Sequence, residues 1–74
     1  MNATTAYKQF VNLARRARAT RAPADVAALA AHYADSGTAC YSVDVALFLV
    51  CPVEGFELTP CWGGAYTLRR VTAC

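Results

Sequence analysis

The β half of this protein is decided by residues 56–72, which read FELTPCWGGAYTLRRVT. Apolar and polar side chains alternate over residues 56–62, which is the pattern of a strand with one buried face. Gly63-Gly64 tolerates the positive φ angles of a type I′ turn, so the two glycines predict a two-residue hairpin loop. A second strand is then expected over residues 65–72, antiparallel to the first.

The two-residue loop also predicts which residues pair across the hairpin. In this register Trp62 lies opposite Ala65, and Glu57 lies opposite Arg70. A cross-strand pair of opposite charge stabilises an antiparallel sheet. The charges therefore agree with the register that the loop predicts.

The apolar run VALFLVC, residues 45–51, precedes the hairpin and is separated from it by the turn sequence PVEG. Its β-branched and aromatic side chains favour a strand, which gives an antiparallel meander of three strands. Residues 39–43 then either extend this strand or add a fourth. The alternative for residues 42–51 is a short buried helix capped by Ser42, because a continuous apolar run has no period that separates strand from helix.

Two helices are expected before the β segment. Apolar residues from Tyr7 onward recur at the spacing of a helix with one apolar face, so residues 4–19 predict the first helix. Pro23 fits the first turn of a second helix. This helix runs to about residue 35, and Gly37 supplies the left-handed residue that ends it.

The predicted fold class is α+β, with two N-terminal helices packed on an antiparallel β-meander of three, or at most four, strands. We expect a single domain over residues 1–74, with a helical part over about residues 4–36 and a β part over about residues 39–73. A domain of this length buries only about 60–65% of its unfolded-chain surface. It therefore has no room for both a core and a deep pocket, and we expect neither an enzyme nor a cofactor.

The four cysteines, Cys40, Cys51, Cys61 and Cys74, form no C-x-x-C pair. Zinc sites usually present such close pairs, so no metal is expected. Two disulfides would allow three connectivities, but no secretory signal is visible and cytoplasmic thiols stay reduced. We expect a cytoplasmic protein in which the first three cysteines are small core residues and Cys74 is exposed. His32, the only histidine, lies off the apolar face of its helix and is expected to be exposed.

The net charge is only +2, but it is strongly sorted along the chain. Residues 1–24 carry five positive charges and no acid, residues 25–68 carry five acids and no base, and residues 69–74 carry two arginines. Positive residues that gather on one face predict an anion- or nucleic-acid-binding patch; the alternative is the solvated outer face of an amphipathic helix. The candidate basic patch consists of Lys8, Arg15, Arg16, Arg18, Arg21, Arg69 and Arg70.

Two further sets of residues are candidates for contact with a partner. Carboxylates that imitate phosphates form the acidic alternative, which consists of Asp25, Asp35, Glu54 and Glu57. Aromatic residues with polar tips are enriched at binding hot spots; here they are Tyr41, Trp62 and Tyr66. A helix-turn-helix is disfavoured, because the second helix has no Lys or Arg with which to read bases.

Taken whole, the chain resembles the small phage-encoded inhibitors of CRISPR–Cas complexes, the anti-CRISPR proteins. The resemblance covers the profile of all 74 residues (tiny, α+β, cysteine-bearing without metal spacing, no catalytic signature) and the run MNATTAYKQFVNLARRARATRAP, residues 1–23. It implies stoichiometric binding to a multisubunit Cas surveillance complex in the host bacterial cytoplasm, so that target DNA cannot bind. The group has no common motif, so no functional residue carries over. Several members are strongly acidic phosphate mimics; this chain is not, which favours steric blocking.

The expected function is therefore that of a non-enzymatic inhibitor, monomeric or homodimeric, which docks a rigid surface on a large protein or ribonucleoprotein complex. The alternative is a small nucleic-acid-binding module that uses the basic residues of the N-terminal helix. A homodimeric structural or toxin–antitoxin component is a third possibility. No partner membrane is expected, because the longest apolar run is far shorter than the roughly 20 residues that span a bilayer.

Overall fold

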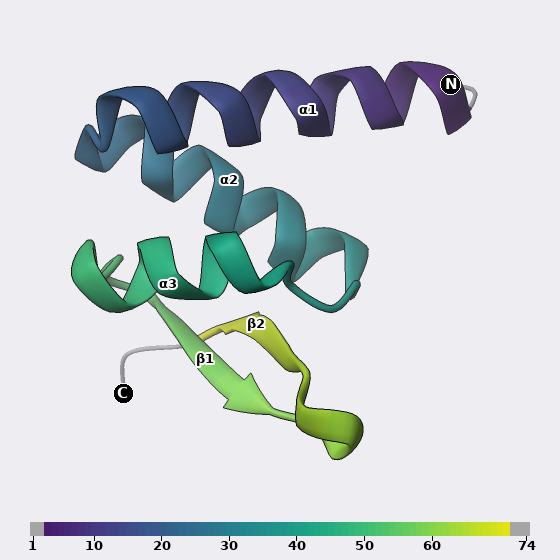
Figure 1. Cartoon of the computed structure of the whole chain (residues 1–74), viewed down its shortest axis with the longest axis vertical. Helices are drawn as coiled ribbons and strands as arrows, with labels where there is room; N and C mark the ends of the chain where they lie inside the picture. Colours follow the sequence, from purple (N-terminus) through teal and green to yellow (C-terminus); the bar gives the residue numbers. More distant parts are fainter. Residues whose placement is uncertain (1–2, 72–74) are drawn as a thin grey trace.

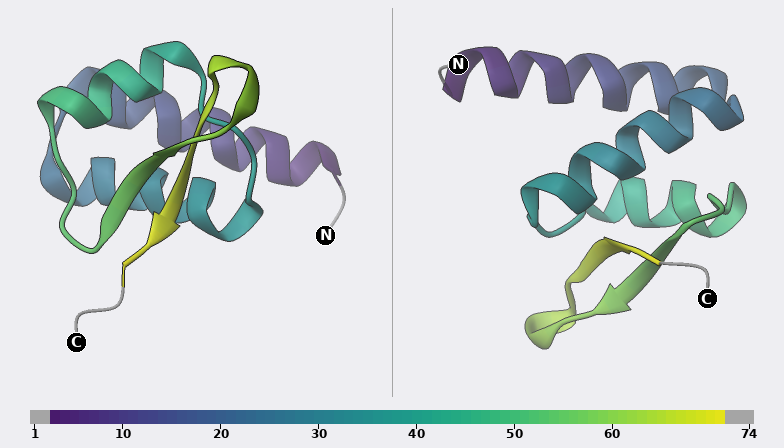
Figure 2. Two further views of the ribbon diagram at one scale, coloured as in Figure 1. Left: turned by 90° about the horizontal axis from the view of Figure 1, so that it is seen from below. Right: turned by 180° about the vertical axis from the view of Figure 1, so that it is seen from behind.

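The computed structural model describes residues 3–71, apart from the side chains of Ala3, Thr4 and Trp62. Within this range the chain is α+β, with three α-helices and a two-stranded antiparallel sheet. Figures 1 and 2 show α1 at one end of the molecule and the β-hairpin at the other, with α2 and α3 between them. The elements are α1 (Ala3–Thr20), α2 (Pro23–Ser36), α3 (Ser42–Val50), β1 (Phe56–Pro60), the short 3₁₀ turn η1 (Trp62–Gly64) and β2 (Tyr66–Arg70).

The two N-terminal helices follow the sequence prediction closely. Ala22, which precedes the proline, is extended at φ −68° and ψ 139°, as the steric clash with a following proline ring requires. Gly37 ends α2 in the left-handed conformation at φ 70°, and its backbone N–H donates to the carbonyl of Tyr33. A left-handed residue satisfies a carbonyl that the helix itself leaves unpaired. Local chemistry therefore sets the break between α1 and α2 and the end of α2.

Residues 42–50 form a helix, so the predicted first strand is wrong and the helical alternative holds. The buried side chains are Asp44, Leu47 and Phe48, which share one face of a helix because they are three and four residues apart. A strand would have divided these three residues between its two faces. Ser42 is the first helical residue rather than the cap; Tyr41 takes that position, without a side-chain capping bond.

The β part within residues 3–71 is one hairpin, and the third strand and the possible fourth strand over residues 39–43 are not found. The register also differs by one residue from the prediction, because the loop has three residues, Trp62–Gly64, instead of two. The backbone N–H of Cys61 donates to the carbonyl of Ala65, so Trp62 does not pair with Ala65. Glu57 consequently lies opposite Arg69 instead of Arg70.

The core is centred on α2, where Val26, Leu29, Ala30 and Tyr33 are fully buried. The other buried apolar residues that join them are Ala14, Ala17, Cys40, Leu47, Phe48 and Leu68. Cys40 belongs to this core and Cys51 packs partly buried against it, as predicted, whereas Cys61 is half-buried beside the loop. All three are free thiols; Cys74 lies outside the described residues. Among the helices described here, none is long and apolar enough to cross a membrane.

Candidate partner-binding surface

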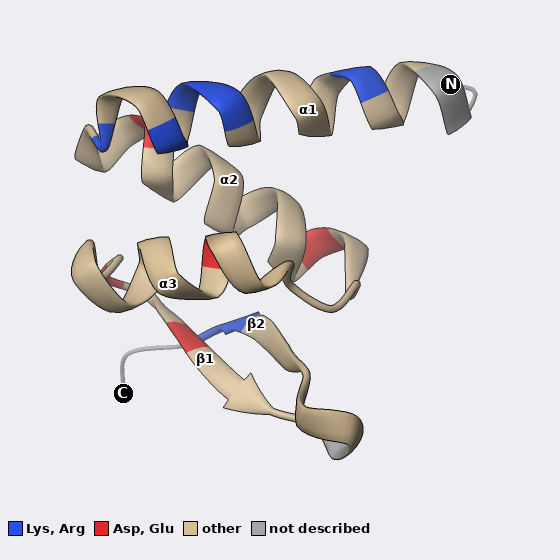
Figure 3. Cartoon of the chain, viewed as in Figure 1, with Lys and Arg blue, Asp and Glu red and all other residues tan. Residues whose placement is uncertain are grey.

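The basic residues do not gather into one patch. Lys8, Arg15 and Arg16 are exposed along α1, and Arg21 is exposed at the corner before α2. Arg18 also lies on α1, whereas Figure 3 shows that the two arginines of β2, Arg69 and Arg70, lie toward the opposite end of the molecule. The predicted seven-residue patch is therefore divided by the fold.

Three of the seven cations form ion pairs within residues 3–71. Arg69 Nε donates to Glu57 Oε1 at 2.7 Å across the hairpin, and Arg70 forms a fork on Asp35 of α2 at 3.1–3.2 Å. The Arg70 guanidinium also lies 5.3 Å from the ring centre of Phe56, within the range of a cation–π contact. The Arg69 pair joins the two strands of the hairpin, and the Arg70 pair joins the hairpin to α2.

Most residues of the acidic alternative are likewise paired within the chain and are not free to bind a partner. Asp35 and Glu57 are engaged by arginines of the same chain, and Asp25 accepts a hydrogen bond from the Thr20 hydroxyl at 2.7 Å. Glu54 is exposed in the segment after α3. Acids spread over α2, β1 and a loop (Figure 3) do not form the row of free carboxylates that a phosphate mimic needs.

The third ion pair is of a different kind, because its acid is completely buried. Asp44 of α3 is 0% exposed. Arg18 of α1 donates two hydrogen bonds to it, from Nε to Oδ1 at 2.7 Å and from Nη2 to Oδ2 at 2.9 Å. The hydroxyl of Tyr33, on α2, donates to the same Oδ2 and accepts from the backbone N–H of Tyr41 at 3.4 Å. One carboxylate thus ties three helices together, and we call Arg18, Tyr33 and Asp44 the polar triad.

The contacts within the polar triad keep Arg18 charged and Tyr33 neutral. The hydrogen bond from Arg18 to Asp44 raises the pKa of the guanidinium, which therefore stays charged. Burial, together with the hydrogen bond to Asp44, raises the pKa of the Tyr33 phenol, which stays neutral and remains a donor. Arg18 is therefore a structural residue first, although its side chain is still 37% exposed.

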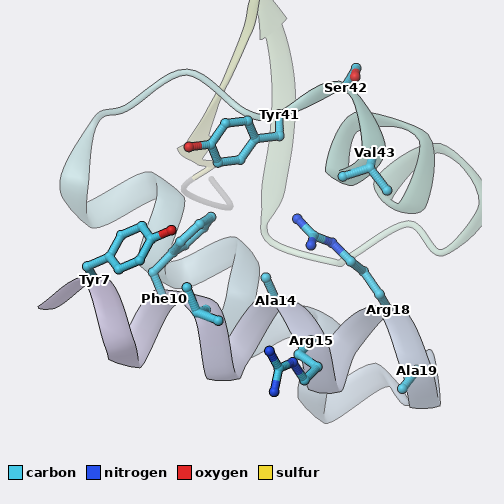
Figure 4. A pocket seen from close by; sticks show the side chains of 10 residues that line it. Tyr7, Phe10, Ala14, Arg15, Arg18, Ala19, Tyr41, Ser42 and Val43 are labelled. Atoms are coloured by element: carbon cyan, nitrogen blue, oxygen red, sulfur yellow. The ribbon is translucent and has the colours of Figure 1, made fainter. Parts of the chain in front are cut away.

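An open groove runs between α1 and the start of α3, beside the polar triad. It has a volume of about 690 Å³, within the range of about 300–1,000 Å³ that is usual for binding sites. Figure 4 shows Tyr41 reaching toward Tyr7 and Phe10 at one end, and Arg18 extending from α1 toward α3. The residues that line this α1–α3 groove are Tyr7, Phe10, Val11, Ala14, Arg15, Arg18, Ala19, Tyr41, Ser42 and Val43.

Three large apolar or aromatic side chains of the α1–α3 groove are strongly exposed. Tyr7 is 64% exposed, Tyr41 59% and Val43 51%. Tyr41 was predicted as an anchor, whereas Tyr7 was expected on the buried face of its helix and Val43 in a strand. Tyr66, another predicted anchor, is exposed on β2 and is not part of the groove lining, and the side chain of Trp62 lies outside the described part of the chain.

Comparison with known protein families, with curated proteins and with solved structures gives no match.

His32 is half-buried, which corrects the expectation of an exposed position. The centre of its ring lies 5.5 Å from the centre of the Phe10 ring. Both residues line a smaller hollow of about 250 Å³ beside the α1–α3 groove. No cysteine lines this hollow, so the Cys–His pair of a nucleophilic enzyme is not assembled there. Within residues 3–71 no group of three or more His, Cys, Asp or Glu side chains is placed to hold a metal ion.

The α1–α3 groove combines the residue types that dominate binding energy at protein interfaces. Tyr and Arg are enriched at hot spots, where an aromatic or guanidinium side chain is desolvated against a partner. The Tyr41 ring is held 5.9 Å from that of Phe10, and Arg18 is held by Asp44. Side chains that are already ordered lose little entropy on binding, so the groove is suited to docking against another molecule.

Proposed function

We propose that this protein is a non-enzymatic inhibitor that docks through the α1–α3 groove on a large protein or ribonucleoprotein complex. The resemblance to anti-CRISPR proteins points to a multisubunit Cas surveillance complex, bound stoichiometrically so that target DNA is blocked sterically. The observation that carries the proposal is the exposure of Tyr7, Tyr41 and Val43 around one open groove. Exposed aromatic and apolar side chains that gather around one groove are typical of an interaction site.

The size of the molecule is consistent with this role. A standard protein interface takes about 800 Å² from each partner, which is roughly 15% of the 5181 Å² surface of this chain. The inhibitor then acts by occupying space on its target, which needs one copy for each complex.

Capture of a purified Cas surveillance complex by the tagged protein tests the proposal. Arg15→Glu and Arg16→Glu form a matched pair, because both residues are exposed neighbours on α1 and only Arg15 lines the groove. We expect Arg15→Glu to weaken capture and inhibition of DNA binding by about tenfold or more. Arg16→Glu should stay within about twofold of the wild type, as rim and surface charges usually do.

Two results would contradict the proposal. The first is a wild-type protein that neither binds the complex nor lowers its affinity for target DNA. The second is inhibition at amounts far below one copy for each complex, because a steric inhibitor cannot turn over. Equal losses of capture in Arg15→Glu and Arg16→Glu would contradict docking through the groove and would indicate that the whole basic face of α1 binds the target.

A second candidate function is direct nucleic-acid binding by α1. It is favoured by the four exposed cations, Lys8, Arg15, Arg16 and Arg21, for which no ion pair is found within residues 3–71. If all four contact phosphates of duplex DNA, the logarithm of the binding constant falls against the logarithm of salt concentration with a slope of about −3.6. Fluorescence anisotropy with labelled DNA and RNA measures this slope, and a slope near zero would remove this candidate.

A further inference from the structure

We propose that the α1–α3 groove receives a protein segment in which an acidic side chain stands beside apolar ones. This inference deepens the proposed function, on which it rests, because it names the chemistry of the partner at that site. The partner's carboxylate is bound by Arg18, Arg15 adds positive charge at the rim of the groove, and the apolar side chains of the partner pack against the exposed tyrosines and Val43.

The geometry of Arg18 carries the first step. Its Nε and Nη2 atoms face Asp44, so only one edge of the planar guanidinium is used. A guanidinium has five N–H donors, and Nη1 makes no hydrogen bond to the described residues. The side chain lines the groove and is 37% exposed. A second carboxylate can therefore bind the outer edge while Asp44 keeps the arginine in place.

The charge of the groove sets the number of acids that it can hold. Arg15 and Arg18 are the charged residues that line it, and the charge of Arg18 is offset by Asp44 behind it. Two positive charges and one negative charge leave a net charge of +1. A single partner carboxylate neutralises this charge, whereas a strand of nucleic acid needs a row of cations along its phosphates.

The walls of the groove favour a protein segment over a nucleic-acid strand. Besides the arginines and the aromatic residues, the lining of the groove includes the aliphatic side chains of Val11, Ala14, Ala19 and Val43. Aliphatic surface is buried favourably against Leu, Ile or Val side chains. Single-stranded nucleic acids need a row of cations beside the aromatic faces on which their bases stack, whereas the groove lining has two arginines, one of them already paired with Asp44.

A second copy of this chain is a poorer occupant than an acidic segment. A two-fold interface places the same patch of both copies together. It would bring Arg15 and Arg18 of each copy to one interface, with no exposed acid in the groove lining to offset them. The charge complement of the groove therefore lies on a different molecule.

Three small probes test the chemistry directly in the whole protein: 3-phenylpropanoate, its neutral amide and phenyl phosphate. Binding is followed by ¹⁵N-resolved NMR, which reports the backbone amides of Ser42 and Val43 and the Nε–H of Arg18. We expect 3-phenylpropanoate to shift these signals and to bind about tenfold more tightly than the amide, because its carboxylate adds charge-assisted hydrogen bonds.

Matched variants separate the groove from general charge effects without disturbing the polar triad. Arg15→Gln should weaken 3-phenylpropanoate several-fold, Val43→Glu should abolish its binding by placing a like charge in the groove, and Arg16→Gln should stay within about twofold of the wild type. All three residues are exposed, and an unchanged amide spectrum away from the groove shows that each variant is folded.

The inference is overturned by equal binding of the carboxylate and the amide, by tighter binding of phenyl phosphate than of the carboxylate, or by carboxylate-dependent shifts that lie only outside the groove. Absence of any shift at millimolar probe concentration overturns it as well. The proposed function fails separately, in the capture experiment. If the groove binds the carboxylate probe but the protein does not bind the Cas complex, this inference is supported and the proposed target is wrong.

Discussion

The ion pair between Arg18 and Asp44 supports a prediction about folding stability. In Arg18→Ala the Asp44 carboxylate, 0% exposed, keeps the Tyr33 hydroxyl as its one side-chain donor among the described residues. Removal of one member of a buried ion pair costs about 3–5 kcal/mol. Because the Arg18 side chain is 37% exposed, solvent screens the pair in part, and we expect the lower end, about 3 kcal/mol.

The loss is large compared with the stability of so small a protein. At roughly 0.05–0.15 kcal/mol per residue, 74 residues give a free energy of unfolding of about 4–11 kcal/mol. Arg18→Ala should therefore lower the thermal midpoint by roughly 12–24 °C, at about 4–8 °C for each kcal/mol. Urea unfolding at neutral pH, followed by far-UV circular dichroism, gives the free energy directly.

A double-mutant cycle with Asp44→Ala isolates the contribution of the pair. The two single variants should together lose more than the double variant, by about 1–3 kcal/mol, because the residues are in direct contact. Arg15→Ala, exposed on the same helix, is the matched control and should change the free energy by less than about 0.5 kcal/mol. A loss below about 1 kcal/mol in Arg18→Ala, the value of a surface pair, would refute the structural role argued for the polar triad.

Three further predictions concern the thiol, the sheet and the loop. Burial raises the pKa of the Cys40 thiol from 9.0 to about 11, so stability is fully present below pH 9.0 and falls as the pH rises to about 11; Cys40→Ala should flatten this fall in the urea midpoint. Glu57→Ala, which removes the exposed pair with Arg69, should cost less than about 1 kcal/mol in thermal unfolding, and a larger loss would contradict the exposure of that pair. Gly63→Ala places a side chain at φ 84° and should cost about 1–2 kcal/mol; an unchanged melting temperature would show that the loop does not hold this conformation.

The candidate site was only partly predictable from the sequence. Tyr41 and Arg15 were named because tyrosine and arginine suit binding sites, and both line the groove. Arg18 was assigned to a surface patch, because a sequence does not show which arginine of α1 meets a buried acid 26 residues away. Asp44 carried a usable signal, since it is the only acid beside the run VALFLVC, and an acid that is buried together with such a run needs a charged or hydrogen-bonding partner.

The sequence by itself determined the features that depend on neighbours along the chain. The break before Pro23 and the end of α2 at Gly37 follow from the backbone angles that these two residues favour, and the glycine pair marked where the hairpin turns, although not the length of its loop. Only the tertiary structure decided that residues 42–50 are helical, because an apolar run suits either state until Asp44, Leu47 and Phe48 meet the rest of the core. It also decided the pairing of the arginines, since one extra loop residue turns Arg69 toward Glu57 and leaves Arg70 for Asp35.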